Sequence, residues 1–154
     1  MPTTTGTFLV TAADADGAVL TDVSDGQVHT LAENPDLAVD QVVDAELATV
    51  PPLEVAWRVE EIHETREIAV IESEERPTTA SRDVAETMPA GELETRERAG
   101  NGAIHVISVP PEITDEAVQD VLADEQTLRT AARLGVERVE VRSAPGIVAV
   151  RYLP

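Results

Sequence analysis

The sequence contains no cysteine and no lysine, and phenylalanine, tryptophan and tyrosine occur once each. The absence of cysteine excludes disulfides, zinc–thiolate sites and thiol nucleophiles. Nowhere do about 18 apolar residues follow one another, and the first residues carry neither positive charge nor an apolar run of signal-peptide length. The sequence therefore predicts neither a membrane span nor an export signal, and we expect a cytoplasmic location.

Acidic residues dominate the charge of the chain. Thirty Asp and Glu residues stand against 11 arginines, which gives a net charge of −19. Such a charge keeps a protein soluble, but at low salt it makes the compact state repel itself. The screening length falls from about 10 Å at 0.1 M salt to about 3 Å at 1 M, so molar salt weakens this repulsion. The composition therefore predicts a halophilic protein.

An acidic disordered chain is the alternative interpretation of this composition. Val, Leu, Ile and Phe make up 40 of the 154 residues. This share exceeds the roughly 20% below which chains of high net charge usually fail to fold. The apolar residues also recur with the periods of strands and helices, so we expect a folded protein of one domain or two small ones.

The first half of the chain shows the period-two alternation of short strands, interrupted by turn residues such as Asp16-Gly17. Residues 37–50 would suit a strand or a short helix, and the strand is preferred. A phase change at Glu60-Glu61 predicts a bulge, and a turn is expected at residues 63–65. The expected strands are 5–12, 18–23, 27–31, 37–50, 53–59 and 66–72. Such a series predicts a small antiparallel β-barrel of OB or SH3 type, because closure removes exposed edges.

A polar, charged segment over residues 72–79 predicts a domain boundary between residues 74 and 75. Beyond it, Gly100-Asn101-Gly102 predicts a hairpin turn, Thr114 a helix N-cap, Asp124 a possible helix break and Gly135 a helix stop. The expected elements are a helix over 80–88, strands over 92–99 and 104–109, a helix over 114–134 and strands over 136–141 and 147–152. The predicted fold class is α+β, with the barrel in residues 1–74 and a four-stranded antiparallel sheet with helices, α-β-β-α-β-β, in residues 75–154.

The chain shows no recognisable catalytic motif. His29, His63 and His105 lie far apart in sequence without the spacing of a zinc protease, and no serine lies in a nucleophile elbow. Thirty carboxylates give many accidental pairs, so paired acids carry no information by themselves. We therefore predict no enzyme activity, no catalytic residue, no metal site and no cofactor.

The positive charge is unevenly distributed. Residues 1–75 carry a net charge of −15, whereas residues 76–154 carry −4. Arginines cluster near the end of the chain, at Arg129, Arg133, Arg138, Arg142 and Arg151. One interpretation is structural, with these arginines neutralising the helix C-terminus, Glu137, Glu140 and nearby carboxylates. The other is a contact surface for phosphate or for an acidic partner, because arginine offers bidentate geometry to both.

Three segments carry a resemblance to a known family: residues 5–11 (Thr-Gly-Thr-Phe-Leu-Val-Thr), 52–59 (Pro-Leu-Glu-Val-Ala-Trp-Arg-Val), and 135–142 with 150–154. With these the chain resembles a haloarchaeal family of uncharacterised small acidic proteins, a domain of unknown function. The resemblance implies a source and a compartment but no activity. Our functional hypothesis is a non-enzymatic interaction module for a protein partner or for self-association. The alternative is binding of RNA or single-stranded nucleic acid through an OB-like barrel and the C-terminal arginines.

Overall fold

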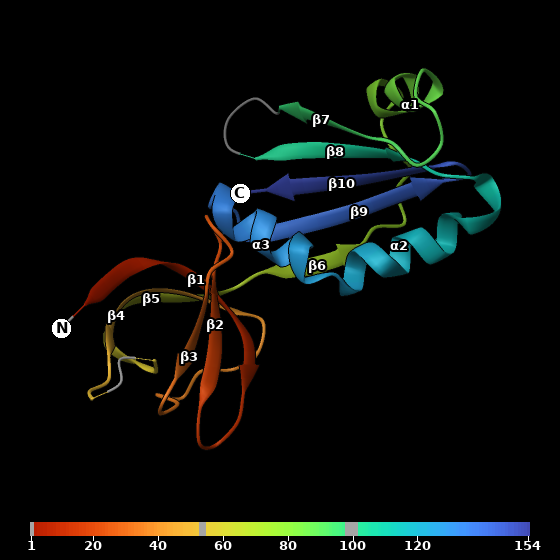
Figure 1. Ribbon diagram of the computed structural model, residues 1–154. Helices are drawn as coiled ribbons and strands as arrows, with labels where there is room; N and C mark the ends of the chain where they lie inside the picture. Colours follow the sequence, from red (N-terminus) through yellow and green to blue (C-terminus); the bar gives the residue numbers. More distant parts are fainter. Residues whose placement is uncertain (1, 53–54, 98–101) are drawn as a thin grey trace. The chain divides into compact units, whose positions relative to one another are not determined.

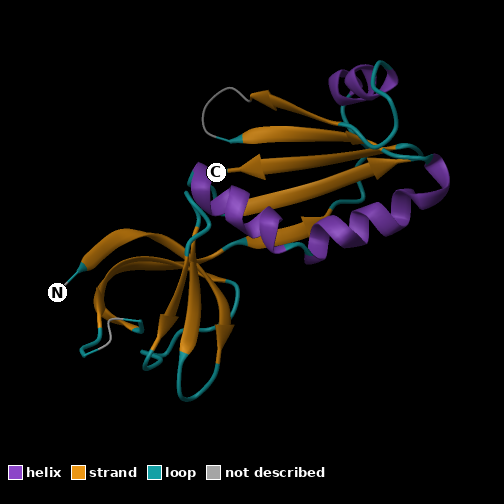
Figure 2. Cartoon of the chain, viewed as in Figure 1, coloured by secondary structure: helices purple, strands orange, loops and turns teal. Residues whose placement is uncertain are grey.

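The computed structural model describes residues 2–52, 55–97 and 102–154 (Figure 1). Strands predominate and three α-helices accompany them, so the mixed α+β class is confirmed (Figure 2). Contacts divide the chain into two compact units, Met1–Ile68 with Leu128–Arg133, and Ala69–Thr127 with Leu134–Pro154. The boundary between residues 74 and 75 stays a prediction. No helix in the described ranges has the length and apolar character needed to cross a bilayer.

The first unit is a ring of five strands in the order β1-β2-β3-β5-β4, in which β1 also pairs with β4. The strands are β1 (Thr3–Ala13), β2 (Ala18–Asp22), β3 (Val28–Leu31), β4 (Gln41–Thr49) and β5 (Trp57–Glu67). Residues 37–50 therefore contain a strand and no helix. The pairing between β3 and β5 is parallel and is limited to the register pair Leu31 and Trp57. The ring thus closes through a short seam.

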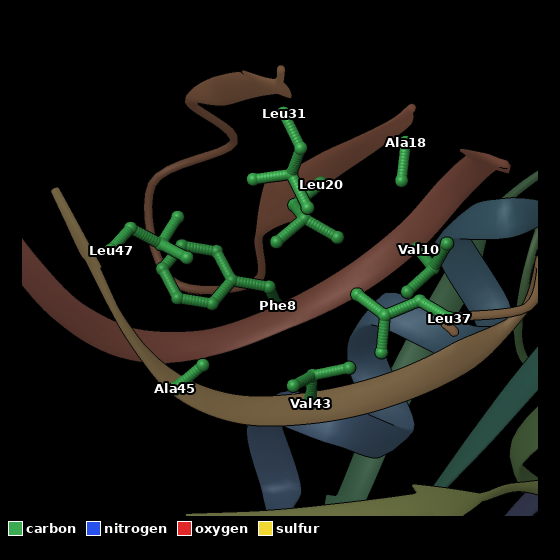
Figure 3. Close-up of a cluster of buried hydrophobic side chains, with 9 residues drawn as sticks. All are labelled: Phe8, Val10, Ala18, Leu20, Leu31, Leu37, Val43, Ala45 and Leu47. Atoms are coloured by element: carbon green, nitrogen blue, oxygen red, sulfur yellow. The ribbon is translucent and has the colours of Figure 1, made fainter. Parts of the chain in front are cut away.

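An apolar cluster fills the interior of this ring (Figure 3). Phe8 and Val10 are alternate residues of β1 with 0% exposure, as the period-two pattern predicts. They pack with Ala18, Leu20, Leu31, Leu37, Val43, Ala45 and Leu47. The β1–β2 hairpin closes at Asp14, whose Oδ1 accepts hydrogen bonds from the backbone N–H groups of Asp16 and Gly17 at 2.8 and 2.9 Å. Sequence alternation and turn chemistry therefore agree in this unit.

Strand β5 corrects two predictions. The bulge at Glu60-Glu61 is confirmed, because Glu61 pairs with Glu46 and Val59 with Leu47, which leaves Glu60 unpaired. The turn predicted at residues 63–65 is wrong: β5 continues to Glu67. Its charged residues resemble a loop in sequence, but β4 supplies a ladder of backbone partners on one side and the side chains face solvent.

The strand predicted over residues 53–59 starts late. Leu53 and Glu54 lie outside the described residues, Val55 is 75% exposed, and β5 begins at Trp57. Trp57 is partly buried against the interior cluster. The apolar alternation of residues 53–59 therefore predicts strand structure correctly only from Trp57 onward.

The second unit is built on a five-stranded mixed sheet in the order β6-β9-β10-β8-β7 (Figure 1). Its strands are β6 (Ala69–Glu72), β7 (Leu93–Glu97), β8 (Ala103–Ser108), β9 (Arg138–Ala144) and β10 (Ile147–Leu153). The predicted four-stranded antiparallel sheet is corrected, because β6 is a fifth strand and pairs parallel to β9. The sequence placed residues 66–72 in the barrel as one strand. The chain instead ends β5 at Glu67 and gives Ala69–Glu72 to this sheet.

The helices of the chain follow the expected order with one split. They are α1 (Thr79–Glu86), α2 (Thr114–Ala123) and α3 (Glu125–Leu134), preceded at α2 by a 3₁₀ turn, Pro111–Ile113. The possible break at Asp124 is confirmed, and Asp124 Oδ1 accepts a hydrogen bond from the backbone N–H of Gln126 at 2.9 Å. Gly135 follows α3 with a φ of +74°, the left-handed conformation that ends helices. The order α-β-β-α-β-β thus holds once the second helix is read as two.

The predicted N-cap at Thr114 is wrong. Thr114 is the first residue of α2, and Ile113 precedes it without a capping side chain. The Thr114 hydroxyl instead donates to the backbone oxygen of Pro111 at 2.9 Å and accepts from the N–H of Gly146, also at 2.9 Å. The hairpin of β7 and β8 is confirmed by the pairing of Glu97 with Ala103, while Gly100 and Asn101 of its turn lie outside the described residues.

Candidate functional site: an arginine cluster around Glu140

Strand β9 separates apolar from charged residues by simple alternation. Val139 and Val141 are 0% exposed on one face of the sheet. Arg138, Glu140 and Arg142 therefore lie on the opposite face. The antiparallel register places Arg151 of β10 directly beside Glu140. Three arginines from two neighbouring strands thus surround one glutamate.

Glu140 is the centre of this group and is itself buried, with 7% exposure. Its Oε1 accepts a short hydrogen bond from Arg142 Nε and another from Arg151 Nη1 at 3.2 Å. Its Oε2 faces Arg138 Nη2 at 3.4 Å. Arg142 reaches a second carboxylate, because its Nη2 lies 2.6 Å from Glu75 Oε2. We call Glu75, Arg138, Glu140, Arg142 and Arg151 the Glu140 cluster.

The Glu140 cluster has more positive than negative charge. Three guanidinium groups face two carboxylates. Burial alone raises the pKa of the Glu140 carboxyl, but the hydrogen bond from Arg142 and the charges of Arg142, Arg151 and Arg138 outweigh it and leave the pKa below its ordinary value. Glu140 is therefore a carboxylate at neutral pH, and one positive charge of the cluster remains uncompensated within it.

The members of the cluster differ in their access to solvent. The side chains of Arg142 and Arg151 are 15% and 18% exposed, whereas that of Arg138 is 52% exposed. Arg142 is further fixed by a hydrogen bond from its Nη1 to the backbone oxygen of Arg76 at 3.5 Å. Arg142 and Arg151 therefore have a mainly structural role on this face of the sheet. Arg138 is the guanidinium most accessible to a binding partner.

The other two predicted contact residues lie elsewhere. Arg129 and Arg133 belong to the part of α3 that contacts assign to the first unit. The Arg129 guanidinium packs against Gly26, where an added Cβ would lie 3.1 Å from Nη2, and its Nε is buried without a hydrogen-bond partner. Arg133 is exposed. Across residues 2–52, 55–97 and 102–154, neither forms an ion pair with a carboxylate.

Sequence reasoning missed two components of this surface. Glu75 lies in the segment taken as a linker, and its pairing with Arg142 depends on where that segment passes the sheet. Ile71 was placed inside the barrel, yet it lies on β6 beside Glu140 in the register and is 39% exposed. The apolar run Ile68-Ala69-Val70-Ile71 among the charges of residues 66–76 was the available signal for a strand, but it did not identify the strand's partner.

The histidines do not assemble into a site. His29 is 3% exposed and its ring meets Phe8 and Trp57 edge-on, with centroid distances of 5.4 and 4.9 Å. His63 lies on exposed β5, 3.8 Å from Glu61, and the ring of His105 packs on Tyr152. In the part of the chain that the structure describes, no three His, Asp or Glu side chains are arranged to hold a metal ion.

Comparison with known proteins identifies one family. The model of a family of unknown function (DUF5812) matches residues 4–143, which covers nearly all of the first unit and the second unit as far as Ser143 in β9, whereas β10 with Arg151 lies outside the match. Neither a curated protein nor a solved structure matches the chain. The predicted resemblance to a domain of unknown function is thereby confirmed, while its haloarchaeal origin stays a prediction.

Proposed function

We propose that this chain, which belongs to the family of unknown function DUF5812, is a non-enzymatic docking module whose Glu140 cluster holds an acidic segment of a protein partner. The observation that carries the proposal is the excess of guanidinium groups over carboxylates in the cluster. A local excess of positive charge is unexpected on a chain with a net charge of −19, and binding of an acidic partner would explain it. One carboxylate of a partner would balance the remaining charge.

The surroundings of the cluster support a protein partner. Ile71 lies next to Glu140 in the register and is 39% exposed, so an aliphatic surface adjoins the exposed Arg138. A phosphate would use the charge and leave Ile71 in water. A peptide segment with both acidic and aliphatic side chains would cover Ile71 and pair with Arg138, which is the arrangement of charge and apolar area typical of protein interfaces.

The experiment is site-specific photo-crosslinking in the source cells. A photoreactive residue at position 71 is expected to give a discrete crosslinked species, with the crosslink mapped to a partner peptide that contains Asp or Glu. The added substitution Arg138→Gln should reduce this yield severalfold, whereas Arg133→Gln should leave it unchanged, because Arg133 is exposed but outside the cluster. A photoreactive residue at Val39, which is 49% exposed on the first unit, measures the background.

Two results would overturn the proposal. One is a yield at position 71 no higher than at Val39. The other is a crosslink that Arg138→Gln and Arg133→Gln weaken equally. Crosslinks to a second copy of the chain would identify self-association, and light scattering in molar KCl would then give a mass above that of the monomer.

The proposed setting is the cytoplasm of a cell with molar internal salt. The support is compositional: carboxylates exceed arginines by 19, lysine is absent, and screening at molar salt makes this charge tolerable. Ion pairs at the surface weaken under these conditions, so a contact that lasts must combine charge with apolar burial. In the Glu140 cluster Arg138 would supply the charge, and Ile71, opposite Glu140 in the register, would supply the apolar surface.

For the first unit we propose a small barrel of OB or SH3 type. The support is the closed order of its five strands and the short parallel seam between β3 and β5, which suit the partly open Greek-key barrel of the OB type. An OB-type barrel adds little support to the alternative function, nucleic-acid binding. Phe8 and Tyr152 are 0% and 3% exposed and Trp57 is partly buried, so base-stacking platforms would have to come from other side chains.

A further inference from the structure

A cavity of about 410 Å³ lies in the second unit, where α1 covers the end of the sheet beside the turn between β9 and β10. Its lining combines aliphatic residues, among them Ala85, Val109 and Ile147, with polar ones. Ligand pockets in proteins typically have about 300–1,000 Å³ and an apolar lining with a few polar groups. The cavity is therefore at the lower end of that range, suited to a ligand of amino-acid size.

Two side chains of opposite charge line this cavity without pairing. Arg82 and Glu86 are four residues apart on α1, the spacing at which helical side chains usually meet. Yet no ion pair joins them within the described residues. The Nε of Arg82 is buried and has no hydrogen-bond partner. A cation and an anion thus face the same cavity, each open to an external partner.

Two backbone N–H groups of the lining already have hydrogen-bond acceptors, so we look to the side chains for ligand recognition. The N–H of Val109 donates to the oxygen of Gly146 at 3.0 Å, and the N–H of Gly146 donates to Thr114 Oγ1 at 2.9 Å. The hydroxyl of Ser108, also in the lining, makes a long contact of 3.5 Å to the oxygen of Met88. The oxygen of this hydroxyl can still accept a hydrogen bond from a ligand.

We propose that this cavity binds a small zwitterion with an aliphatic body, of the class of free α-amino acids. The ligand carboxylate would pair with Arg82 and its ammonium group with Glu86, while the aliphatic part lies on Ala85, Val109 and Ile147. Each charge of the ligand would then meet its opposite. This site is separate from the docking function of the Glu140 cluster, and either proposal can fail alone.

The experiment uses the full chain, labelled with ¹⁵N, in 2 M KCl. L-Leucine, N-acetyl-L-leucine, which lacks the ammonium group, and L-leucinamide, which lacks the carboxylate, are titrated while the amide signals of Val109, Gly146 and Ile147 are followed. Leucine is expected to saturate these shifts. Each blocked compound is expected to bind at least about tenfold more weakly, which corresponds to about 1.4 kcal/mol.

Variants of α1 then assign the two charges. Arg82→Gln should weaken leucine and N-acetyl-leucine but not leucinamide, and Glu86→Gln should weaken leucine and leucinamide but not N-acetyl-leucine. Asp83→Asn is the matched control, since Asp83 is exposed on the same helix but does not line the cavity. The proposal is overturned if leucine gives no saturable shift, if the three compounds bind equally, or if Asp83→Asn weakens binding as much as Glu86→Gln.

Discussion

The substitution Glu140→Gln keeps the size of the side chain and removes the charge that Arg138, Arg142 and Arg151 share. Glu140 is 7% exposed, and two of its three partners are largely buried, at 15% and 18% side-chain exposure. A hydrogen bond to a charged group contributes about 1.5–3 kcal/mol, and removing one partner of a buried pair costs about 3–5 kcal/mol. Arg138, 52% exposed, adds little because solvent screens it.

We expect Glu140→Gln to lower the free energy of unfolding by about 3 kcal/mol, at the lower end of that range because the glutamine oxygen can still accept from Arg142 and Arg151 although the negative charge is lost. The measurement is urea denaturation in 2 M KCl at pH 7. Glu137→Gln is the control, since Glu137 is exposed and should change stability by less than about 0.5 kcal/mol. A loss below about 1 kcal/mol for Glu140→Gln, or one equal to the control's, would show that the Glu140 carboxylate does not stabilise the folded protein through its arginines.

The same substitution predicts a pH dependence. Because the folded protein lowers the pKa of Glu140, its contribution is fully present above the ordinary value of 4.5 and is lost as the pH falls through the folded value. The stability difference between wild type and Glu140→Gln should therefore be constant from pH 7 to about 5 and shrink in more acidic solution. A difference that grows below pH 4.5 would contradict the assignment.

Three further predictions concern the rest of the chain. The thermal midpoint of the wild type should climb steeply between 0.2 and 3 M KCl because salt screens the net charge of −19, and a flat midpoint by calorimetry would contradict this. Asp124→Ala should lower unfolding free energy in urea by about 1 kcal/mol, because the bond to the Gln126 N–H is lost, while exposed Asp120→Ala should have a smaller effect. Gly135→Ala should cost about 1–2 kcal/mol by the same assay. An added Cβ there meets nothing within 4 Å, so backbone strain at a φ of +74° is the whole effect.

The sequence predicted those structural features that depend only on residues close together in the chain. The alternation around Phe8, the phase change at Glu60 and the stop at Gly135 are each confirmed, because each follows from a few consecutive residues. The pairing of Ala69–Glu72 with β9, nearly 70 residues away, could not be predicted this way. A strand's period of two is the same whichever sheet it joins.

The candidate site shows the same division. The alternation of residues 138–142, which can be read from the sequence, places Arg138, Glu140 and Arg142 on one strand face, and the structure brings the three side chains together. Arg151 joined them through the register of β9 and β10, and Glu75 through the path of a segment without regular structure. Arg129 was grouped with them by proximity in sequence, although contacts assign it to the other unit.

The first unit contains six residues, Leu128–Arg133, that the ribosome makes about 60 residues after the rest of it. Ala132 and Leu128 pack with Leu9, Val23 and Val42. We therefore expect this apolar patch to stay uncovered during translation until residues 128–133 leave the ribosome. A nascent chain that stopped near residue 74 would carry a complete ring with an uncovered apolar flank. Chaperones should therefore bind such stalled chains. The binding should disappear in chains long enough for residue 133 to leave the ribosome, because residues 128–133 then cover the apolar patch.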